Sequence, residues 1–182
     1  MECNHGIVSM THRLKGSLEL NAVIISFNQG KGYIEKDWGT SFPNSYLWLH
    51  SNNFERSDVS FMCSVAHIPF LAGSFKGFIC NLCLDGTEYR FATYNGSRLE
   101  LLEFSSSHSR LILRRKGLIL KIEASMELGG LLKSPHLGAM SRQIKEGIFG
   151  KVTITLENKA GEIIFHGTGN QCGIELMPDG GK

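Results

Sequence analysis

The residues with the clearest chemical potential lie in one short segment, residues 32–43, which reads Gly-Tyr-Ile-Glu-Lys-Asp-Trp-Gly-Thr-Ser-Phe-Pro. Two carboxylic acids, Glu35 and Asp37, stand there among three aromatic residues. Aromatic surface around a carboxyl group excludes water and disfavours its charged form, which raises its pKa. A carboxylic acid that stays neutral at pH 7 can donate a proton. The segment therefore predicts a general acid in an apolar pocket or, as the structural alternative, a buried Asp that caps a turn beside a packed Trp.

Alternation along this segment predicts which of its side chains share a face. Successive side chains of a β-strand point to opposite sides, so Tyr33, Glu35 and Asp37 lie together if the segment is a regular strand. Trp38 then points away from Asp37 unless a bulge or a turn begins near Gly39. We predict Asp37 as the proton donor, with Glu35 as the second candidate. The residues predicted to line the pocket are Tyr33, Trp38, Tyr46, Trp48 and His50.

Four other motifs carry chemistry in some proteins, and each has a plainer explanation in this sequence. Cys80 and Cys83 have the CxxC spacing, but no second cysteine pair or histidine pair follows at the distance of a zinc site. Residues 30–32 (Gly-Lys-Gly) lack the full phosphate-loop spacing and a following helix, so a hairpin turn is predicted there. Ser107-His108 and the basic residues 114–116 are expected in solvated loops and turns. The sequence predicts no metal site and no cofactor.

Length, charge and composition exclude several classes of protein. The chain has 182 residues, with 19 Lys and Arg against 17 Asp and Glu, and its formal net charge of +2 does not indicate a nucleic-acid partner. Hydrophobic residues make up 42% and charged residues 20%, which excludes a disordered chain. No stretch gives the ~18 apolar residues of a transmembrane helix, and no export signal is visible. The 5 cysteines, an odd number, fit free thiols in a reducing compartment, so a soluble cytoplasmic protein is expected.

A period of two in hydrophobicity dominates the chain and indicates β-strands. Residues 118–124 and 152–156 alternate apolar and polar side chains, as half-buried strands require. Asp85-Gly86 and Asn95-Gly96 have the composition of two-residue hairpin turns. Only residues 131–146 could hold a short helix, and the glycines and the proline in and around them argue against a long one. These patterns predict an all-β, antiparallel fold with little helix.

The 32–43 segment, together with Trp48 and Asn52-Asn53-Phe54, resembles the signature of the tocopherol cyclase family. Related lipocalin-like proteins, including the carotenoid hydratases, carry a similar Asp-x-x-Trp-Gly type of motif. The resemblance covers most of the chain, because further matching residues lie toward both of its ends. They are Ser9-Met10, His12-x-Leu14-x-Gly16, Ser134-Pro135, Met140-x-Arg142-x-Ile144-x-Glu146 and Gly173-Ile-Glu175.

This resemblance implies a lipocalin-like fold. Members of the family carry two lipocalin-like β domains in tandem, and this chain resembles only the later one. We therefore expect residues 1–182 to form a single lipocalin-like β domain, as an antiparallel β-barrel or a strongly curved sandwich. A substrate cavity between two domains would be incomplete in this chain, so the expected protein partner is a missing N-terminal domain or a second copy in a homodimer.

The resemblance also implies a reaction. The family closes a chromanol ring, in which the phenolic oxygen of a prenylated quinol adds across the nearest double bond of its isoprenoid tail. An alkene is a weak base, so its protonation needs an acid that is close and shielded from water, and aromatic faces stabilise the cation that forms. The family tends to have Gln where this chain has His50, which either orients a phenol or is a structural core histidine.

Three hypotheses are compatible with the sequence. A cyclase, or a relative that acts on isoprenoid double bonds, requires an acid in an apolar cavity of ligand size. A lipocalin-like protein that binds an apolar ligand without turnover requires only the cavity, and a purely structural half would expose an apolar face. An ion pair of Asp37 with Lys36 or Arg142 would argue against the acid role, because such pairing lowers the pKa of a carboxyl group.

Overall fold

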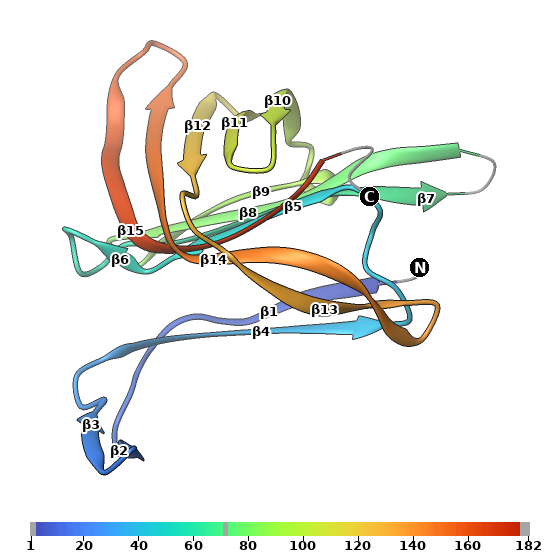
Figure 1. Ribbon diagram of the computed structural model, residues 1–182. Helices are drawn as coiled ribbons and strands as arrows, with labels where there is room; N and C mark the ends of the chain where they lie inside the picture. Colours follow the sequence, from blue (N-terminus) through green and yellow to red (C-terminus); the bar gives the residue numbers. More distant parts are fainter. Residues whose placement is uncertain (1–2, 71–72, 179–182) are drawn as a thin grey trace.

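The computed structural model describes residues 3–70 and 73–178, which fold almost entirely into antiparallel strands (Figure 1). Apart from one 3-10 turn, η1 (Thr93–Asn95), these residues contain no helix. The described residues therefore include no helix that could cross a membrane. The all-β prediction is confirmed. The strands are β1 (Cys3–Arg13), β2 (Ser17–Leu20), β3 (Val23–Ser26), β4 (Lys31–Gly39), β5 (Tyr46–Ser51), β6 (Asn53–Phe54), β7 (Ser60–Phe70), β8 (Gly73–Leu84), β9 (Thr87–Ala92), β10 (Arg98–Phe104), β11 (His108–Arg115), β12 (Leu118–Ser125), β13 (Gly130–His136), β14 (Ala139–Asn158) and β15 (Ile163–Met177).

Most strands belong to one large curved sheet. Its main path runs β10-β11-β12-β14-β15-β5-β7-β8-β9, with β13 attached to β14 and β6 attached to β15. The two ends of this path, β10 and β9, share no ladder within the described residues, so the sheet does not close. The barrel prediction is therefore wrong. The curved antiparallel sheet is compatible with the other alternative, a sandwich-like fold.

One face of the curved sheet forms the hydrophobic core. The period of two in β12 and β14 is the cause, since Leu120 pairs with Leu156 and Ile122 with Ile154 in register, and all four are fully buried. Because the sheet curves, these side chains share one buried cluster with residues of its other half, such as Phe61 in β7. Full burial of side chains of this size contributes about 1.5–3 kcal/mol each.

Strand β5 has packing partners on both of its faces. Leu47 and Leu49 point into the core and have no exposed surface. Tyr46, Trp48 and His50 alternate with them and therefore point to the opposite face of the sheet. That face is covered by a separate two-stranded ribbon of β1 and β4, which runs below the main sheet in Figure 1.

The β1–β4 ribbon continues into a projecting hairpin. β2 and β3 pair only with each other and extend away from the main sheet (Figure 1). Asn21 and Ala22 form the turn between them, both with positive φ. Leu18, Leu20 and Ile24 are mostly exposed. The hairpin thus presents the kind of exposed apolar surface that the structural hypothesis requires.

The turn predictions hold at one of the two dipeptides. Asp85-Gly86, with φ of 51° and 71°, joins β8 to β9 as predicted. Asn95-Gly96 is not a two-residue turn, because Asn95 ends η1 and its side chain accepts a hydrogen bond from the Ala92 N–H at 3.1 Å. The hairpin turn predicted at residues 30–32 is also displaced. Gly30 closes a turn with Phe27, and the next two residues already belong to β4.

Residues 131–146 form the hairpin of β13 and β14, so the short helix considered there is wrong. Leu137 and Gly138, with φ of 50° and 83°, make the turn. Pro135 is tolerated because β13 pairs only with β14 and the ladder is irregular at this position. Pairing between strands thus decides the structure of a segment whose local pattern was ambiguous.

The β13–β14 hairpin also holds the loop that leads from β4 to β5. The Gly138 N–H donates to the Thr40 carbonyl at 2.8 Å. The Arg142 guanidinium donates to the carbonyls of Pro43 and Asn44 at 3.0 Å and 2.9 Å. These bonds fix the loop beside the outward face of β5, where Pro43 joins the wall of the groove described next.

Candidate functional site

A groove of about 530 Å³ lies between the β1–β4 ribbon and the outward face of the main sheet. It crosses the strands, since its lining residues Glu175, Trp48, Ser64 and Ile79 are successive partners in register across β15, β5, β7 and β8. The end at β15 and β5 is polar, because β1 and β4 add ionisable side chains there, and the end at β8 is apolar. The other apolar and aromatic lining residues include Trp38, Phe42, Pro43, Tyr46, Ala66, Ile68, Phe75, Phe78 and Tyr94.

Glu35 on β4 has more hydrogen-bond donors around it than the other acids of the groove. Its Oε2 accepts hydrogen bonds from the hydroxyl of Tyr33 and, at 2.9 Å, from the indole Nε1 of Trp48. Burial raises the pKa of Glu35, and the two hydrogen bonds and nearby His5 oppose that rise because they stabilise the carboxylate. Glu35 is thus a carboxyl group held in one position by donors from two strands.

Asp37 pairs with His5, which lies directly opposite it on β1. Asp37 Oδ1 is 2.6 Å from His5 Nδ1. Burial lowers the pKa of His5, but the hydrogen bond and the negative charge of Asp37, with Glu35 and Glu175 nearby, outweigh burial and raise it overall. The second ring nitrogen, Nε2, is buried, lies 3.9 Å from Glu35 Oε2 and has no hydrogen-bond partner within the described residues. His5 Nε2 is therefore a polar atom beside Glu35 whose hydrogen-bonding capacity no described residue uses.

Glu175 reaches the same groove from the main sheet, on β15. Its Oε2 accepts a hydrogen bond from the Tyr46 hydroxyl at 2.7 Å. Burial raises the pKa of Glu175 to about 7, with the Tyr46 hydrogen bond acting against the rise and the charges of Glu146, Glu35 and Asp37 adding to it. A carboxyl group with such a pKa is protonated in a large fraction of molecules at neutral pH.

Tyr33 and His50 stack on each other behind Glu35, with their ring centroids 3.8 Å apart. Both were predicted to line the pocket, whereas the groove is lined by the neighbours Glu35 and Trp48. Burial lowers the pKa of His50 to about 4, so the ring is neutral at pH 7. His50 therefore supports Tyr33 by packing, which agrees with the structural explanation of this histidine.

Both predicted acids reach the groove, together with the predicted lining residues Trp38, Tyr46 and Trp48. Trp38 lies at the rim, where it is 51% exposed, and the Lys36 ammonium is 5.1 Å from its ring centroid. Since Lys36 lies over Trp38 and Arg142 binds backbone carbonyls, neither cation is the partner of Asp37.

Sequence analysis missed two ionisable groove residues, His5 and Glu175, as members of the site. His5 belongs to no chemical motif and joins the acids only when β1 pairs with β4. Glu175 is the one acid in an otherwise apolar stretch whose neighbours Ile174 and Leu176 are buried, which is a weak signal for an inward-facing group. Its hydrogen-bond partner, Tyr46, lies 129 residues away in the sequence.

The cluster of His5, Glu35 and Asp37 has the composition of a metal site, since one ligand atom from each lies within 4.8 Å of the others. Each of its three residues already binds a protein group, although His5 Nε2 has no hydrogen-bond partner among the described residues. His5 and Asp37 bind each other, and Glu35 Oε2 accepts two donors. We therefore interpret the cluster as a hydrogen-bonded network.

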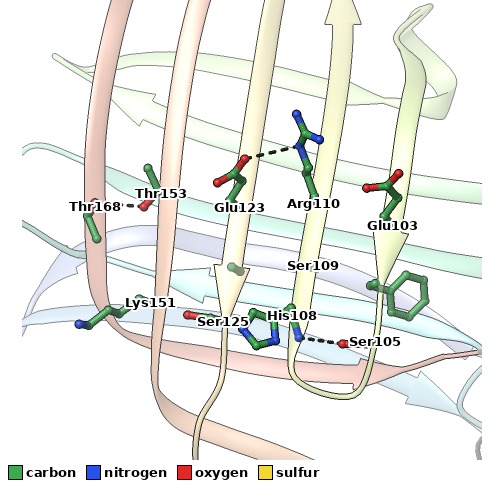
Figure 2. A pocket seen from close by; sticks show the side chains of 12 residues that line it. Glu103, Ser105, His108, Ser109, Arg110, Glu123, Ser125, Lys151, Thr153 and Thr168 are labelled. Atoms are coloured by element: carbon green, nitrogen blue, oxygen red, sulfur yellow. Dashed lines mark hydrogen bonds and ion pairs between the residues drawn. The ribbon is translucent and has the colours of Figure 1, made fainter.

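A second hollow, of about 760 Å³, lies on the outer face of β10, β11, β12, β14 and β15 (Figure 2). Its wall is a row of polar side chains, in which Arg110 and Glu123 approach to 3.5 Å with side chains 58% and 68% exposed. Ser107 and His108 form a 2.9 Å hydrogen bond at its edge, also in an exposed position. These groups are solvated, so the hollow lacks the shielded acids of the groove.

Gly173 lets Trp48 lie against β15 and so controls the position of the groove wall. A Cβ atom at Gly173 would lie 2.8 Å from Trp48 Cζ3, which forces the ring to move. We expect Gly173→Ala to lower the free energy of unfolding by about 1–2 kcal/mol and to weaken the bond from Trp48 to Glu35. Urea unfolding, followed by the fluorescence of Trp48 in a Trp38→Phe background, measures both effects.

The matched control for this prediction is Gly130→Ala. A Cβ atom there would meet nothing within 4 Å, so the substitution leaves the groove unchanged. Equal stability and equal Trp48 emission for both variants would contradict the packing role assigned to Gly173.

Comparison with known proteins gives one match. A family model described as tocopherol cyclase-like matches residues 4–177, which is nearly the whole chain. No curated protein and no solved structure matches the chain.

Proposed function

The chain belongs to the tocopherol cyclase-like family, and from this premise we propose that its groove catalyses the acid-promoted closure of a prenylated quinol to a chromanol. The observation that carries the proposal is the convergence of three carboxyl groups and a histidine at one end of an apolar groove. An alkene accepts a proton only from a nearby acid that is shielded from water. Burial supplies that shielding for Glu35 and Glu175, and it also raises the pKa of both carboxyl groups.

The reaction needs a group that accepts the phenolic proton as well as one that protonates the alkene. We assign the acceptor role to Glu35, because the donors Tyr33 and Trp48 stabilise its carboxylate form. Asp37 accepts a hydrogen bond from His5 Nδ1 and so orients the ring, and His5 in its imidazolium form, which its raised pKa favours, donates from Nε2 to the quinol oxygen. The proposal thus moves Asp37 and Glu35 from the donor role, which the sequence suggested, to the quinol side of the reaction.

The apolar end of the groove suits the isoprenoid tail. Ile68, Phe75 and Phe78 line this part and offer no hydrogen bond from their side chains. Toward the acids, the rings of Trp48 and Tyr46 lie beside the expected position of the double bond, where each aromatic face can stabilise a cation by about 0.5–2 kcal/mol. Water excluded from this space favours ring closure over hydration.

A second candidate function is the binding of an apolar ligand without turnover. The apolar lining of the groove alone supports it, since a carrier needs a cavity and no acid. A pure carrier gives no reason for shielding the carboxyl groups of Glu35 and Glu175 at one end of that cavity, because burial of each has a cost in free energy. The cyclase proposal accounts for them.

The chemistry of the substrate also fits a reducing compartment such as the cytoplasm. All five cysteines are free thiols, and Cys63, Cys80 and Cys172 are buried. Thiols persist where disulfides are reduced, and a quinol is the reduced form of its quinone. We therefore propose that the protein works in the compartment in which its substrate remains a quinol.

Anaerobic incubation of the full chain with geranyl hydroquinone in detergent micelles tests the proposed function. The expected product is the chromanol, an isomer of the substrate, and in D2O it carries one deuterium on the carbon next to the new tertiary ether. Binding of geranyl hydroquinone is followed separately by quenching of tryptophan fluorescence. Tight binding without any chromanol would reject the cyclase in favour of the carrier.

A further inference from the structure

We propose that Glu175 is the proton donor that starts ring closure. This inference rests on the proposed function and adds to it the residue that acts on the alkene. Glu175 stands on β15 of the main sheet, whereas Glu35 and Asp37 reach the groove from β4 of the ribbon. The two walls thus offer carboxyl groups to different parts of one ligand.

The surroundings of the two glutamates decide which of them keeps a proton. Glu35 receives two hydrogen bonds and lies near the imidazole of His5, all of which favour its charged form. Glu175 receives one hydrogen bond, from Tyr46. When two carboxyl groups share a site in such unequal surroundings, the one whose carboxylate form is less stabilised keeps its proton and acts as the acid.

The charged groups around Glu175 add to this difference. Charged groups on three strands act on Glu175 or on its neighbours His5 and Tyr46. They are Glu146 and Arg142 on β14, Glu35 and Asp37 on β4, and His5 on β1. Three of them are carboxylates, and their charges raise the pKa of Glu175 in addition to the larger effect of burial. Arg142 acts on Tyr46 and is held by the backbone of the β4–β5 loop.

One oxygen of Glu175 is free to act on a ligand. Tyr46 donates to Oε2, and no hydrogen bond from a described residue reaches Oε1. Glu175 also pairs in register with Trp48, so the carboxyl group lies beside an aromatic ring at the point where the groove changes from polar to apolar. The double bond nearest the quinol ring would occupy this place when the quinol hydroxyl meets Glu35.

The proposed step balances without any co-reactant. The O–H bond of Glu175 breaks, and its proton forms a C–H bond at the less substituted alkene carbon, which leaves a cation at the tertiary carbon. The phenolic oxygen forms the C–O bond with its electron pair, and its proton passes to Glu35. The product is an isomer of the substrate, and proton exchange with solvent returns Glu175 to its acid form and Glu35 to its carboxylate.

Glu175→Gln tests the assignment in the geranyl hydroquinone assay with the full chain. The amide oxygen of Gln still accepts the Tyr46 hydrogen bond, so the fold is retained, but the side chain has no acidic proton. We expect kcat to fall by about 100-fold or more, with binding of geranyl hydroquinone unchanged by fluorescence quenching. Unchanged kcat in this variant, beside an active wild type, would overturn the role of Glu175 and leave the cyclase function intact.

Two further variants test the same role through the pH profile. The donor must be protonated, so wild-type kcat declines as pH rises through the pKa of Glu175. Tyr46→Phe removes a donor to the Glu175 carboxylate and is expected to move this decline to higher pH, whereas Glu146→Gln removes a nearby negative charge and moves it to lower pH. A decline that stays in place in both variants would overturn the assignment. A wild type that binds geranyl hydroquinone and forms no chromanol would instead reject the proposed function itself.

Discussion

The Glu35→Gln variant is expected to form chromanol at least about 100-fold more slowly than the wild type, because an amide cannot take the phenolic proton. The change is nearly isosteric. The new amide would still offer an oxygen to the Tyr33 hydroxyl and to Trp48 Nε1, the two donors that hold the Glu35 side chain. Loss of rate with retained binding therefore reports on chemistry. Single-turnover measurement of the chromanol, with binding followed by fluorescence quenching, separates these effects.

Asp37→Asn is the matched comparison for Glu35→Gln. The change also removes one negative charge from β4, but Asp37 acts through His5, to which it is bound at 2.6 Å. We expect a smaller loss of rate and, because His5 loses the charge that raises its pKa, a pH profile in which the contribution of His5 shifts to lower pH. If Asp37→Asn abolished turnover and Glu35→Gln did not, Asp37 would be the more important of the two acids, as the sequence predicted.

The second large effect concerns stability and comes from His50. Burial holds the pKa of folded His50 at about 4, against about 6.5 in an unfolded chain. Between these values the unfolded state binds a proton and the folded state does not, so the free energy of unfolding falls as the pH is lowered from about 6.5 to about 4. The shift corresponds to about 3 kcal/mol. His50→Gln removes this dependence.

The measurement compares the wild type with His50→Gln by urea unfolding at several pH values. The difference between the two proteins is the relevant quantity, because Glu175 contributes a slope of the opposite sign. Its pKa is raised in the folded state, so its contribution to stability is lost as pH rises toward about 7. His50→Phe, which keeps a ring against Tyr33, should lose the same pH dependence. If the free energy of unfolding depended on pH in the same way in all three proteins, folding would not lower the pKa of His50.

The fold could be predicted as far as local patterns determine it. Alternation identified the strands around Leu120 and Ile154 because each has one buried face, and Asp85-Gly86 identified a turn that requires positive φ. Closure into a barrel could not be predicted. It depends on whether β9 and β10 pair with each other, which is a relation between distant edges, and no residue type near either strand specifies it.

The site could be predicted only in part for a similar reason. The spacing of Glu35 and Asp37 on one strand is local, so their common face followed from the period of two. The contacts that distinguish the two acids come from other strands: Trp48 on β5 binds Glu35, and His5 on β1 binds Asp37. Glu175 lies in the matching stretch Gly173-Ile-Glu175, but its place in the site follows from the register between β15 and β5, which that stretch does not reveal.

The origin of the groove wall in β15 has a consequence for folding kinetics. β15 is the last strand that the structure describes, and it pairs with β5, whose Tyr46 lies 129 residues before Glu175. Pairings across such separations form slowly, because a long loop must close before any contact offsets its entropy. During synthesis, the edge of β5 that pairs with β15 therefore stays unpaired until β15 has been made. We expect catalytic competence to appear with the slowest refolding phase, after most strand structure has formed.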